Sequence, residues 1–242
     1  MAQLMDKIAI VTGAGRGIGR SVAEHLAMEG ATVIGTARTA GELNELAAET
    51  KDAPGEVIPL LGDITDEQFV EDLFHQVRQR FGRLDILVNN AGIAPFGPVE
   101  VLTVDDVRRC LELNIVAAFN CMSHAVRLMK ATGDTGKIIN IGSVRSHWTE
   151  GGDAGAYNAS KAGLRSMTES VARQLHGSGS RIAVSLVCPG VVNTTLTNPK
   201  GEDRPGWLRP ADIARSVLHV ATAPPEVNVF DVVVIPMCQQ PW

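Results

Sequence analysis

Aromatic residues are scarce in this chain: only 4% of the 242 residues are Phe, Trp or Tyr, and Tyr157 is the single tyrosine. Long apolar runs are also missing, since no run approaches the roughly 18 residues that a membrane-spanning helix requires. The amino terminus lacks the charged, apolar and small-residue sections of a secretory signal. These absences argue against membrane insertion and secretion, and we expect a cytoplasmic protein.

Cysteines and positive charges are few. Cys110, Cys121, Cys188 and Cys238 are widely spaced, with no Cys-x-x-Cys pair and no histidine at a metal-ligand spacing. We therefore expect reduced thiols, no disulfide framework and no bound metal. The 22 Lys and Arg residues against 27 Asp and Glu give a net charge of -5 without a basic stripe, which argues against nucleic-acid binding.

Apolar residues, in contrast, are abundant and regularly spaced. With 45% hydrophobic content, residues 1–242 can bury one large core, and we expect them to form a single domain. Short β-branched runs alternate with longer periodic segments, which is the pattern of βαβ units. We therefore predict an α/β fold, a doubly wound and mostly parallel seven-stranded sheet with helices on both faces.

The predicted elements follow from this alternation. The strands are expected at residues 7–12, 32–36, 57–60, 84–89, 137–141, 182–187 and 229–235. The helices are expected at residues 18–30, 41–50, 66–81, 105–130, 156–176 and 210–222. Several strands are almost continuously apolar, as strands covered on both faces should be.

The first predicted strand ends in a glycine-rich turn, Thr12-Gly13-Ala14-Gly15-Arg16-Gly17-Ile18-Gly19, which leads into a helix. Backbone N–H groups and the helix dipole at such a turn can bind a pyrophosphate, so the turn predicts a dinucleotide site. The strict G-x-G-x-x-G spacing fails, because Ile18 stands at the last glycine position. The alternative interpretation is a glycine turn needed only for tight packing.

The end of the second predicted strand bears on cofactor choice. A carboxylate there would bind the ribose 2'-hydroxyl of NAD, but the chain has Thr36-Ala37-Arg38, with no acid before Glu42. Arg38 and Arg16 could both face a 2'-phosphate through charge-assisted hydrogen bonds. We therefore predict NADP(H) rather than NAD(H). Alternatively, Arg38 is an ordinary solvated residue at a helix start.

Tyr157 and Lys161 lie one helical turn apart in the predicted helix 156–176 and therefore share a face. A nearby cation favours the phenolate and lowers the pKa of a phenol, which would make Tyr157 a proton donor or acceptor for a carbonyl or carbinol oxygen. The alternative is a helix start with a lysine that extends to solvent.

These motifs occur together and in order with three others: Asn89-Asn90-Ala91-Gly92, Ser143 and Pro189-Gly190-Val191-Val192-x-Thr194. With Asn114 added, the set resembles the short-chain dehydrogenase/reductase family, in its single-domain branch, over nearly the whole chain. The resemblance implies a Rossmann fold and an NADP-dependent oxidoreductase. Such an enzyme transfers hydride reversibly between nicotinamide and a carbonyl or secondary alcohol.

The resemblance also implies roles for four catalytic residues. Tyr157 would be the general acid in reduction and the general base in oxidation, and Lys161 would lower its pKa and bind the nicotinamide ribose. Ser143 would hydrogen-bond the carbonyl oxygen and hold it near the phenol. Asn114 would organise a water chain behind the lysine.

Further residues would bind the cofactor. By resemblance, Asp63 and Ile64 would border the adenine, the Asn89 segment would line its ribose, and the Pro189 segment would hold the nicotinamide half. The full implied set is Gly13, Arg16, Gly17, Ile18, Gly19, Arg38, Asp63, Ile64, Asn89, Ala91, Gly92, Tyr157, Lys161, Pro189, Gly190, Val192 and Thr194.

The substrate is expected to be a small-molecule carbonyl or alcohol. Its pocket is expected to be formed by residues 94–96, Asp153, a loop at about 193–209, and the set Ser143, Arg145, His147, Trp148 and Val191. Arg145 and His147 could meet a polar substrate, or they could face solvent. The stretch 224–229 is similar to NADP-dependent enzymes that act on small hydroxy acids and 3-hydroxy amino acids.

The carboxy terminus departs from the family. Many members end their last strand with a Val-Asp-Gly-Gly-like segment, whereas this chain ends in Val232-Val233-Val234-Ile235-Pro236-Met237-Cys238-Gln239-Gln240-Pro241-Trp242. The usual tetramer contacts are therefore in doubt, while the helices 105–130 and 156–176 suggest a dimer interface. We expect a homodimer or a homotetramer.

Two other classes of protein remain possible. A non-catalytic dinucleotide-binding sensor or regulatory subunit would keep the glycine turn, but it has no reason to combine Ser143, Asn114, Tyr157 and Lys161. An epimerase or dehydratase on the same scaffold would use a transient hydride transfer. Such relatives usually carry a carboxy-terminal substrate domain, for which this chain has no room.

Overall fold

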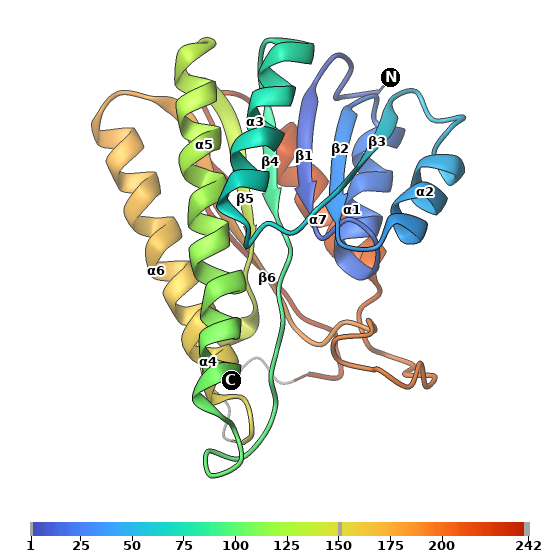
Figure 1. The fold of residues 1–242 in the computed structure, drawn as a ribbon, viewed down its shortest axis with the longest axis vertical. Helices are drawn as coiled ribbons and strands as arrows, with labels where there is room; N and C mark the ends of the chain where they lie inside the picture. Colours follow the sequence, from blue (N-terminus) through green and yellow to red (C-terminus); the bar gives the residue numbers. More distant parts are fainter. Residues whose placement is uncertain (1, 150–151, 240–242) are drawn as a thin grey trace.

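The computed structural model describes residues 2–149 and 152–239, so Gln240, Pro241 and Trp242 of the tail lie outside the described residues. Seven parallel strands form one sheet in the order β3-β2-β1-β4-β5-β6-β7, which confirms the predicted fold class (Figure 1). Their bounds are β1 (Ile8–Thr12), β2 (Thr32–Ala37), β3 (Glu56–Leu61), β4 (Ile86–Asn89), β5 (Thr135–Ile141), β6 (Arg181–Pro189) and β7 (Asp231–Val234).

Helices connect the strands. They are α1 (Gly17–Met28), α2 (Ala40–Glu49), α3 (Glu67–Phe81), α4 (Val104–Leu111), α5 (Ala118–Ala131), α6 (Gly155–Gly177) and α7 (Pro210–Thr222), with a π-helical segment η1 (Glu112–Ala117) and a 3-10 turn η2 (Val144–Ser146). Their ends follow local sequence signals. The Asp66 side chain accepts hydrogen bonds from the first turn of α3, and Gly82 ends that helix with a φ of 72°.

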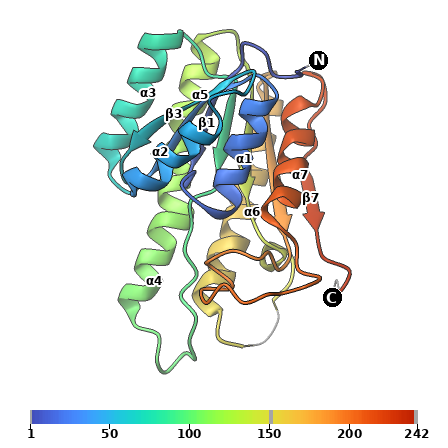
Figure 2. The ribbon, with the colours of Figure 1, turned by 90° about the vertical axis from the view of Figure 1, so that its right-hand side faces the viewer.

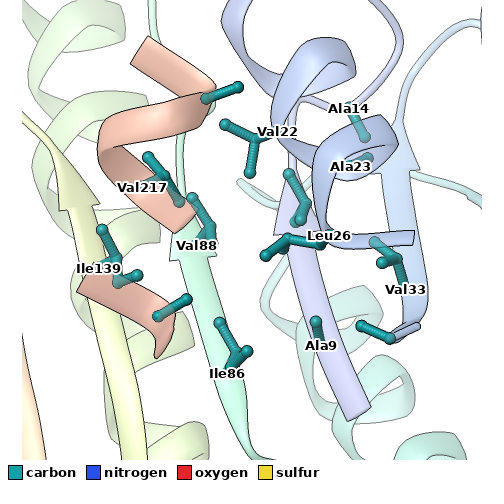
Figure 3. Packing of buried hydrophobic residues seen from close by; sticks show 14 of the residues in the cluster. Ala9, Ala14, Val22, Ala23, Leu26, Val33, Ile86, Val88, Ile139 and Val217 are labelled. Atoms are coloured by element: carbon teal, nitrogen blue, oxygen red, sulfur yellow. The ribbon is translucent and has the colours of Figure 1, made fainter. Parts of the chain in front are cut away.

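Alternation along the strands builds two cores. Successive side chains point to opposite faces, so Ala9, Val11 and Val33 pack with α1, α2 and α7 on one face (Figure 3). Ile8, Ile10 and Ile34 pack with α3, α5 and α6 on the opposite face. The sheet therefore lies between two helical layers, as Figure 2 shows from the side.

The observed elements keep the predicted order with bounds within two residues of those predicted, but one predicted helix is interrupted. The predicted helix 105–130 is interrupted by the π-helical segment η1, where the Asn114 side chain forms hydrogen bonds with the backbone N–H and carbonyl of Ile93. The last strand ends at Val234 instead of residue 235, and Pro236 follows closely, which cannot donate to a sheet ladder. No helix in the described part of the chain is long and apolar enough to cross a membrane.

The chain reverses its direction of strand addition between β1 and β4. In a doubly wound sheet, this reversal opens a crevice at the carboxyl ends of the strands. The loops that follow β4 and β6 extend from this same end of the sheet, at the bottom of Figure 1. The predicted ligand site should therefore lie there.

Candidate active site

A cleft of about 1470 Å³ lies at the carboxyl ends of the strands. Its walls come from segments far apart in the sequence: the glycine turn, the end of β2 and the residues that follow β2 and β3, the loop after β4, part of α4 and η1, the segment after β5 with the start of α6, and the loop after β6. The lining includes the predicted residues Gly13, Arg16, Gly17, Ile18, Arg38, Asp63, Ile64, Ala91, Gly92, Ser143, Tyr157, Lys161, Pro189, Gly190, Val192 and Thr194. Most of the predicted site residues are thus brought together.

The glycine turn is shaped by close backbone approach. Gly13 and Gly17 have φ values of 67° and 58°, which favour glycine. Gly19 has another role, because a Cβ there would lie 2.2 Å from the Gly13 carbonyl oxygen. It is outside the cleft lining and lets α1 pack tightly against the turn.

The start of α1 is open toward the cleft. Its N-cap residue Arg16 makes no side-chain capping hydrogen bond, whereas α3 is capped by Asp66. The first N–H groups of α1 have no intrahelical acceptor, and Gly17 and Ile18 line the cleft. This arrangement fits a pyrophosphate, which would accept from these N–H groups.

Charged residues surround the predicted adenosine end. The Arg38 Nη1 lies 3.6 Å from an Asp63 carboxylate oxygen, and the Arg16 Nη1 lies 4.0 Å from Glu42 Oε1. Burial acts to raise the pKa of Asp63, but hydrogen bonds from Thr65 and the charge of Arg38 outweigh it, and the pKa is lowered. Both arginine side chains remain largely exposed and face the cleft.

Asn89 is directed away from the cleft, although it was predicted to bind the cofactor. Its Nδ2 donates to Asn140 Oδ1 (2.9 Å) and to the Ala118 carbonyl (3.2 Å), so it ties β4 to β5 inside the sheet. The next residue, Asn90, lines the cleft and donates to the Thr12 carbonyl (2.9 Å) and the Gly13 carbonyl (3.2 Å). Asn90 therefore supports the glycine turn.

Lys161 is a buried cation beneath the cleft. Its side chain is held by a 2.8 Å hydrogen bond from Nζ to the Ile141 carbonyl, and Nζ lies 5.7 Å from the centroid of the Tyr157 ring. Burial lowers the pKa of Lys161 to about 8, since a desolvated ammonium is disfavoured. The predicted pairing of Tyr157 and Lys161 on one helix face is present.

Tyr157 also lines the cleft, but its pKa moves opposite to the direction expected from a nearby lysine. Burial raises the pKa of the phenol, while a hydrogen bond from Ser143 and the charge of Arg145 lower it only in part. Ser143 is positioned by the turn η2: its Oγ accepts from Arg145 N (3.2 Å), and its own N donates to Ser146 Oγ (3.2 Å). At neutral pH the phenol of Tyr157 is therefore protonated.

Asn114 sits in η1 with its side chain fully engaged. Its Oδ1 accepts from Ile93 N, and its Nδ2 donates to the Ile93 carbonyl and to Ser160 Oγ, each at 2.9 Å. Ser160 in turn donates to the Tyr157 carbonyl (2.8 Å). Ser160 was not among the predicted residues, although it lies within the Tyr157 motif, and it links Asn114 to α6.

Four of the predicted substrate-pocket residues, Arg145, His147, Trp148 and Val191, are not among those that line the cleft. Apolar residues in the cleft lining include Ile93, Ala94, Pro95, Leu196 and Pro199. The exposed ring of Phe96 lies 6.3 Å from the Tyr157 ring.

The stretch 224–229, which carried the hydroxy-acid resemblance, lies elsewhere. Lys137 Nζ donates to the carbonyls of Pro224 (3.2 Å) and Val227 (2.7 Å), and neither residue lines the cleft. This stretch is therefore held near the amino-terminal half of β5, and none of its residues lines the cleft at the carboxyl ends of the strands.

His147, Cys188 and Asp231 place possible metal ligands within 4.8 Å of one another. However, Arg165 Nε lies 3.7 Å from Asp231 Oδ2, and burial raises the pKa of Cys188 to about 12. A carboxylate that already pairs with a cation is a poor metal ligand, because the arginine repels a second positive charge. We interpret the contact of His147 Nε2 with Asp231 Oδ1 (3.2 Å) as an anchor between η2 and β7.

The fold and the cleft together define a dinucleotide-binding protein of the Rossmann class with an oxidoreductase-type site. A family model described as short chain dehydrogenase matches residues 7–205. The chain belongs to the short-chain dehydrogenase/reductase family, as its motifs predicted, and is an oxidoreductase of that family.

The relatives and solved structures match this chain over nearly its full length. The chain is 33% identical to "Dehydrogenase/reductase SDR family member 11" of Mus musculus, covering 96% of this chain and 95% of the relative. It is 33% identical to "Farnesol dehydrogenase" of Aedes aegypti, covering 98% of each. A metagenomic short-chain oxidoreductase solved in complex with NADP superposes with a TM-score of 0.85 at 31% identity, covering 98% of this chain and all of that one.

A second solved structure, a short chain dehydrogenase from Burkholderia cenocepacia J2315 in complex with NADP, has a TM-score of 0.86 at 31% identity and covers 96% of this chain and 98% of that one. Both neighbours therefore share the architecture and were solved with a nicotinamide dinucleotide. This likeness supports a dinucleotide site in the cleft described above.

Proposed function

We propose that this protein is an NADP-dependent oxidoreductase that interconverts a carbonyl and a secondary alcohol. The observation that carries the proposal is the convergence of Tyr157, Ser143 and Lys161 on one cleft, next to an uncapped helix start. A non-catalytic dinucleotide-binding protein would need the helix start but not a buried lysine beneath a phenol.

The protonation state favours reduction. Because burial raises the pKa of Tyr157, the phenol carries its proton at neutral pH and can donate it to a carbonyl oxygen. Ser143 can hold that oxygen near the phenol, since its hydroxyl interacts with Tyr157. When nicotinamide is bound, it supplies the hydride. The same residues would work in reverse for oxidation of an alcohol.

NADP(H) is proposed over NAD(H) because the adenosine end is basic where a 2'-phosphate would lie. Arg38 and Arg16 both line the cleft with exposed guanidinium groups. Each can form charge-assisted hydrogen bonds with a phosphate. The NADP complexes of the two structural neighbours support this choice.

The substrate is proposed to be a carbonyl compound with an apolar or aromatic substituent. The cleft lining contains Ala94, Pro95 and Leu196, and the exposed ring of Phe96 lies 6.3 Å from the ring of Tyr157. Such a lining gains free energy from burying apolar surface. The relative named farnesol dehydrogenase is consistent with an apolar substrate.

We also propose that the protein forms a homodimer through α4 and α5. Large apolar side chains are exposed on both helices, among them Val104 (65%) on α4 and Phe119 (52%) on α5. Large exposed apolar patches mark interaction surfaces of soluble proteins. Sedimentation velocity tests this proposal, and a monomer at micromolar concentration would contradict it.

The decisive experiment compares the wild type with Tyr157→Phe over a panel of ketones, aldehydes and alcohols, with NADPH and NADH in parallel. Loss of the acid should lower kcat by about 10²- to 10⁴-fold while cofactor binding is retained. Equal turnover in the two proteins would exclude Tyr157 as the proton donor. If both bind cofactor and neither turns over any substrate, the sensor alternative is favoured.

A further inference from the structure

The carboxy-terminal tail returns from the sheet edge toward the cleft. Gly190 N donates to the Val234 carbonyl at the end of β7 (2.7 Å), and Gln239 N donates to the Pro236 carbonyl (2.9 Å). The second bond closes a turn over residues 236–239. This turn brings the tail against the loop that follows β6. The tail is the part of the chain that departs from the usual family ending.

Gln239 makes the principal contact. Its Oε1 accepts a 2.9 Å hydrogen bond from the backbone N–H of Val191. A Cβ on Gly190 would lie 2.2 Å from this oxygen and 3.0 Å from Pro236 Cδ. The glutamine side chain therefore passes directly over the backbone of Gly190, and glycine leaves the room for it.

The loop held in this way forms one wall of the cleft. Pro189, Gly190 and Val192 line it, and Val191 lies between them with its amide directed to Gln239. Cys238 Sγ also donates to the Gly206 carbonyl (3.3 Å) in the loop 193–209. The tail thus contacts both loops on this side of the cleft.

We propose that Gln239 is a positioning residue for the nicotinamide side of the cleft. By accepting the Val191 N–H, it fixes the loop 189–192 before the cofactor binds and so reduces the ordering cost of binding. This inference rests on the proposed function for the identity of the cofactor. It assigns Gln239 no contact with reacting atoms.

Amide hydrogen exchange and NADPH titration test this role without any turnover. In Gln239→Ala, the Val191 amide should exchange faster, and the Kd for NADPH should rise by about threefold to tenfold, the effect of one lost hydrogen bond. Gln239→Glu keeps an acceptor oxygen and should retain slow exchange at Val191. Met237→Ala is the matched control, because the Met237 side chain is fully exposed in the same turn.

A second variant tests the same contact between Gln239 and the loop 189–192 by a change in the loop. Gly190→Ala should push aside the flexible end of Gln239 and produce faster exchange at Val191. If the two residues act through one contact, the Val191 amide of the Gly190→Ala/Gln239→Ala double variant should exchange no faster than in the more affected single variant. Unchanged Val191 exchange and unchanged NADPH affinity in Gln239→Ala, or an equal effect of Met237→Ala, would overturn the proposal.

The outcomes are separable from those of the proposed function. If the wild type binds NADPH without reducing any carbonyl, the oxidoreductase proposal fails, while the exchange and binding data still decide the role of Gln239. If turnover occurs and Gln239→Ala behaves as wild type in both assays, the positioning role alone fails.

Discussion

The two ends of the cleft are built on opposite physical principles. At the proposed adenosine end, Arg38 pairs with Asp63 at 3.6 Å, but its side chain is 70% exposed. At the proposed catalytic end, Lys161 is only 5% exposed and donates to a carbonyl of β5. One end uses solvated charges on flexible side chains, and the other uses a buried charge fixed to the sheet.

This difference indicates which properties can change independently. Exposed ion pairs contribute little to stability, so residues such as Arg38 can be replaced without loss of the fold. A buried ammonium is costly, because desolvation disfavours the charge. Cofactor choice should therefore be separable from catalysis, and each of the following variants should affect one end without the other.

The largest effect is expected for Lys161→Met. Without the cation beneath Tyr157, kcat should fall by about 10²-fold or more, since proton transfer by a positioned group typically contributes this much. Preference for NADPH over NADH should stay unchanged, because the adenosine end is intact. Parallel kcat and Kd measurements with both cofactors test this; a changed preference would show that the two ends are coupled.

The same variant should be more stable than the wild type. Burial lowers the pKa of Lys161 from 10.5 to about 8, which corresponds to a cost on the order of 3 kcal/mol at neutral pH. Below pH 8 the native and unfolded states both hold the proton and the cost is full; between pH 8 and about 10.5 the native lysine is neutral and the cost declines. Urea unfolding should therefore show an advantage of Lys161→Met that shrinks over this range.

Lys137→Met is the matched control for both measurements. Lys137 is also buried, its pKa is also lowered by burial, and it donates to backbone carbonyls outside the cleft. Its replacement should leave kcat of the folded protein unchanged. A similar loss of kcat in both variants would mean that the effect of Lys161→Met is structural.

An intermediate effect is expected for Arg38→Ala. This change removes a phosphate ligand and uncovers the Asp63 carboxylate, which repels a 2'-phosphate. The ratio of kcat/KM for NADPH to that for NADH should fall by about tenfold to a hundredfold. Arg173→Ala, an exposed arginine paired with Glu169 on α6, should leave the ratio unchanged. A fall in kcat with both cofactors would contradict a separate adenosine end.

The smallest effect is expected for Phe96→Ala. Loss of the ring near Tyr157 should raise KM for aryl ketones by about threefold to tenfold, the typical contribution of one aromatic pair. Short aliphatic ketones should be unaffected, and Phe96→Leu should fall between the two because it keeps apolar surface. If Phe96→Ala changes the KM values for aryl ketones and for short aliphatic ketones by the same factor, an aromatic contact is excluded.

The sheet and most of the cleft were predictable because their signals are local. Apolar periodicity identified the strands, and the glycine turn and the Tyr157 motif each lie within eight residues of sequence. The sequence does not show which of two adjacent residues of the same type directs its side chain toward the cleft. Asn89 and Asn90 are chemically identical, yet the first bonds to Asn140 inside the sheet and the second lines the cleft, because β4 ends at Asn89 and Asn90 begins the loop that follows it.

Features that depend on long-range packing were also not predictable. The contact between Gln239 and Val191 joins residues 48 positions apart, and no local pattern indicates that the tail turns back. Likewise, the sequence placed Lys161 beside Tyr157 and predicted a lowered phenol pKa, whereas burial raises it. The extent of desolvation depends on the whole surrounding structure and not on the spacing of two residues.

The π-helical segment Glu112–Ala117 marks a place where the chain can change in length by one residue without a change in fold. A π-helical turn holds one more residue than an α-helical turn, so α4 and α5 keep the faces they would have in a regular helix one residue shorter. Deletion of the exposed Val116 should therefore leave the core side of α5 in place while Asn114 loses its bonds to Ile93. A single-residue insertion or deletion here can alter the chemistry of the site in a protein that still folds.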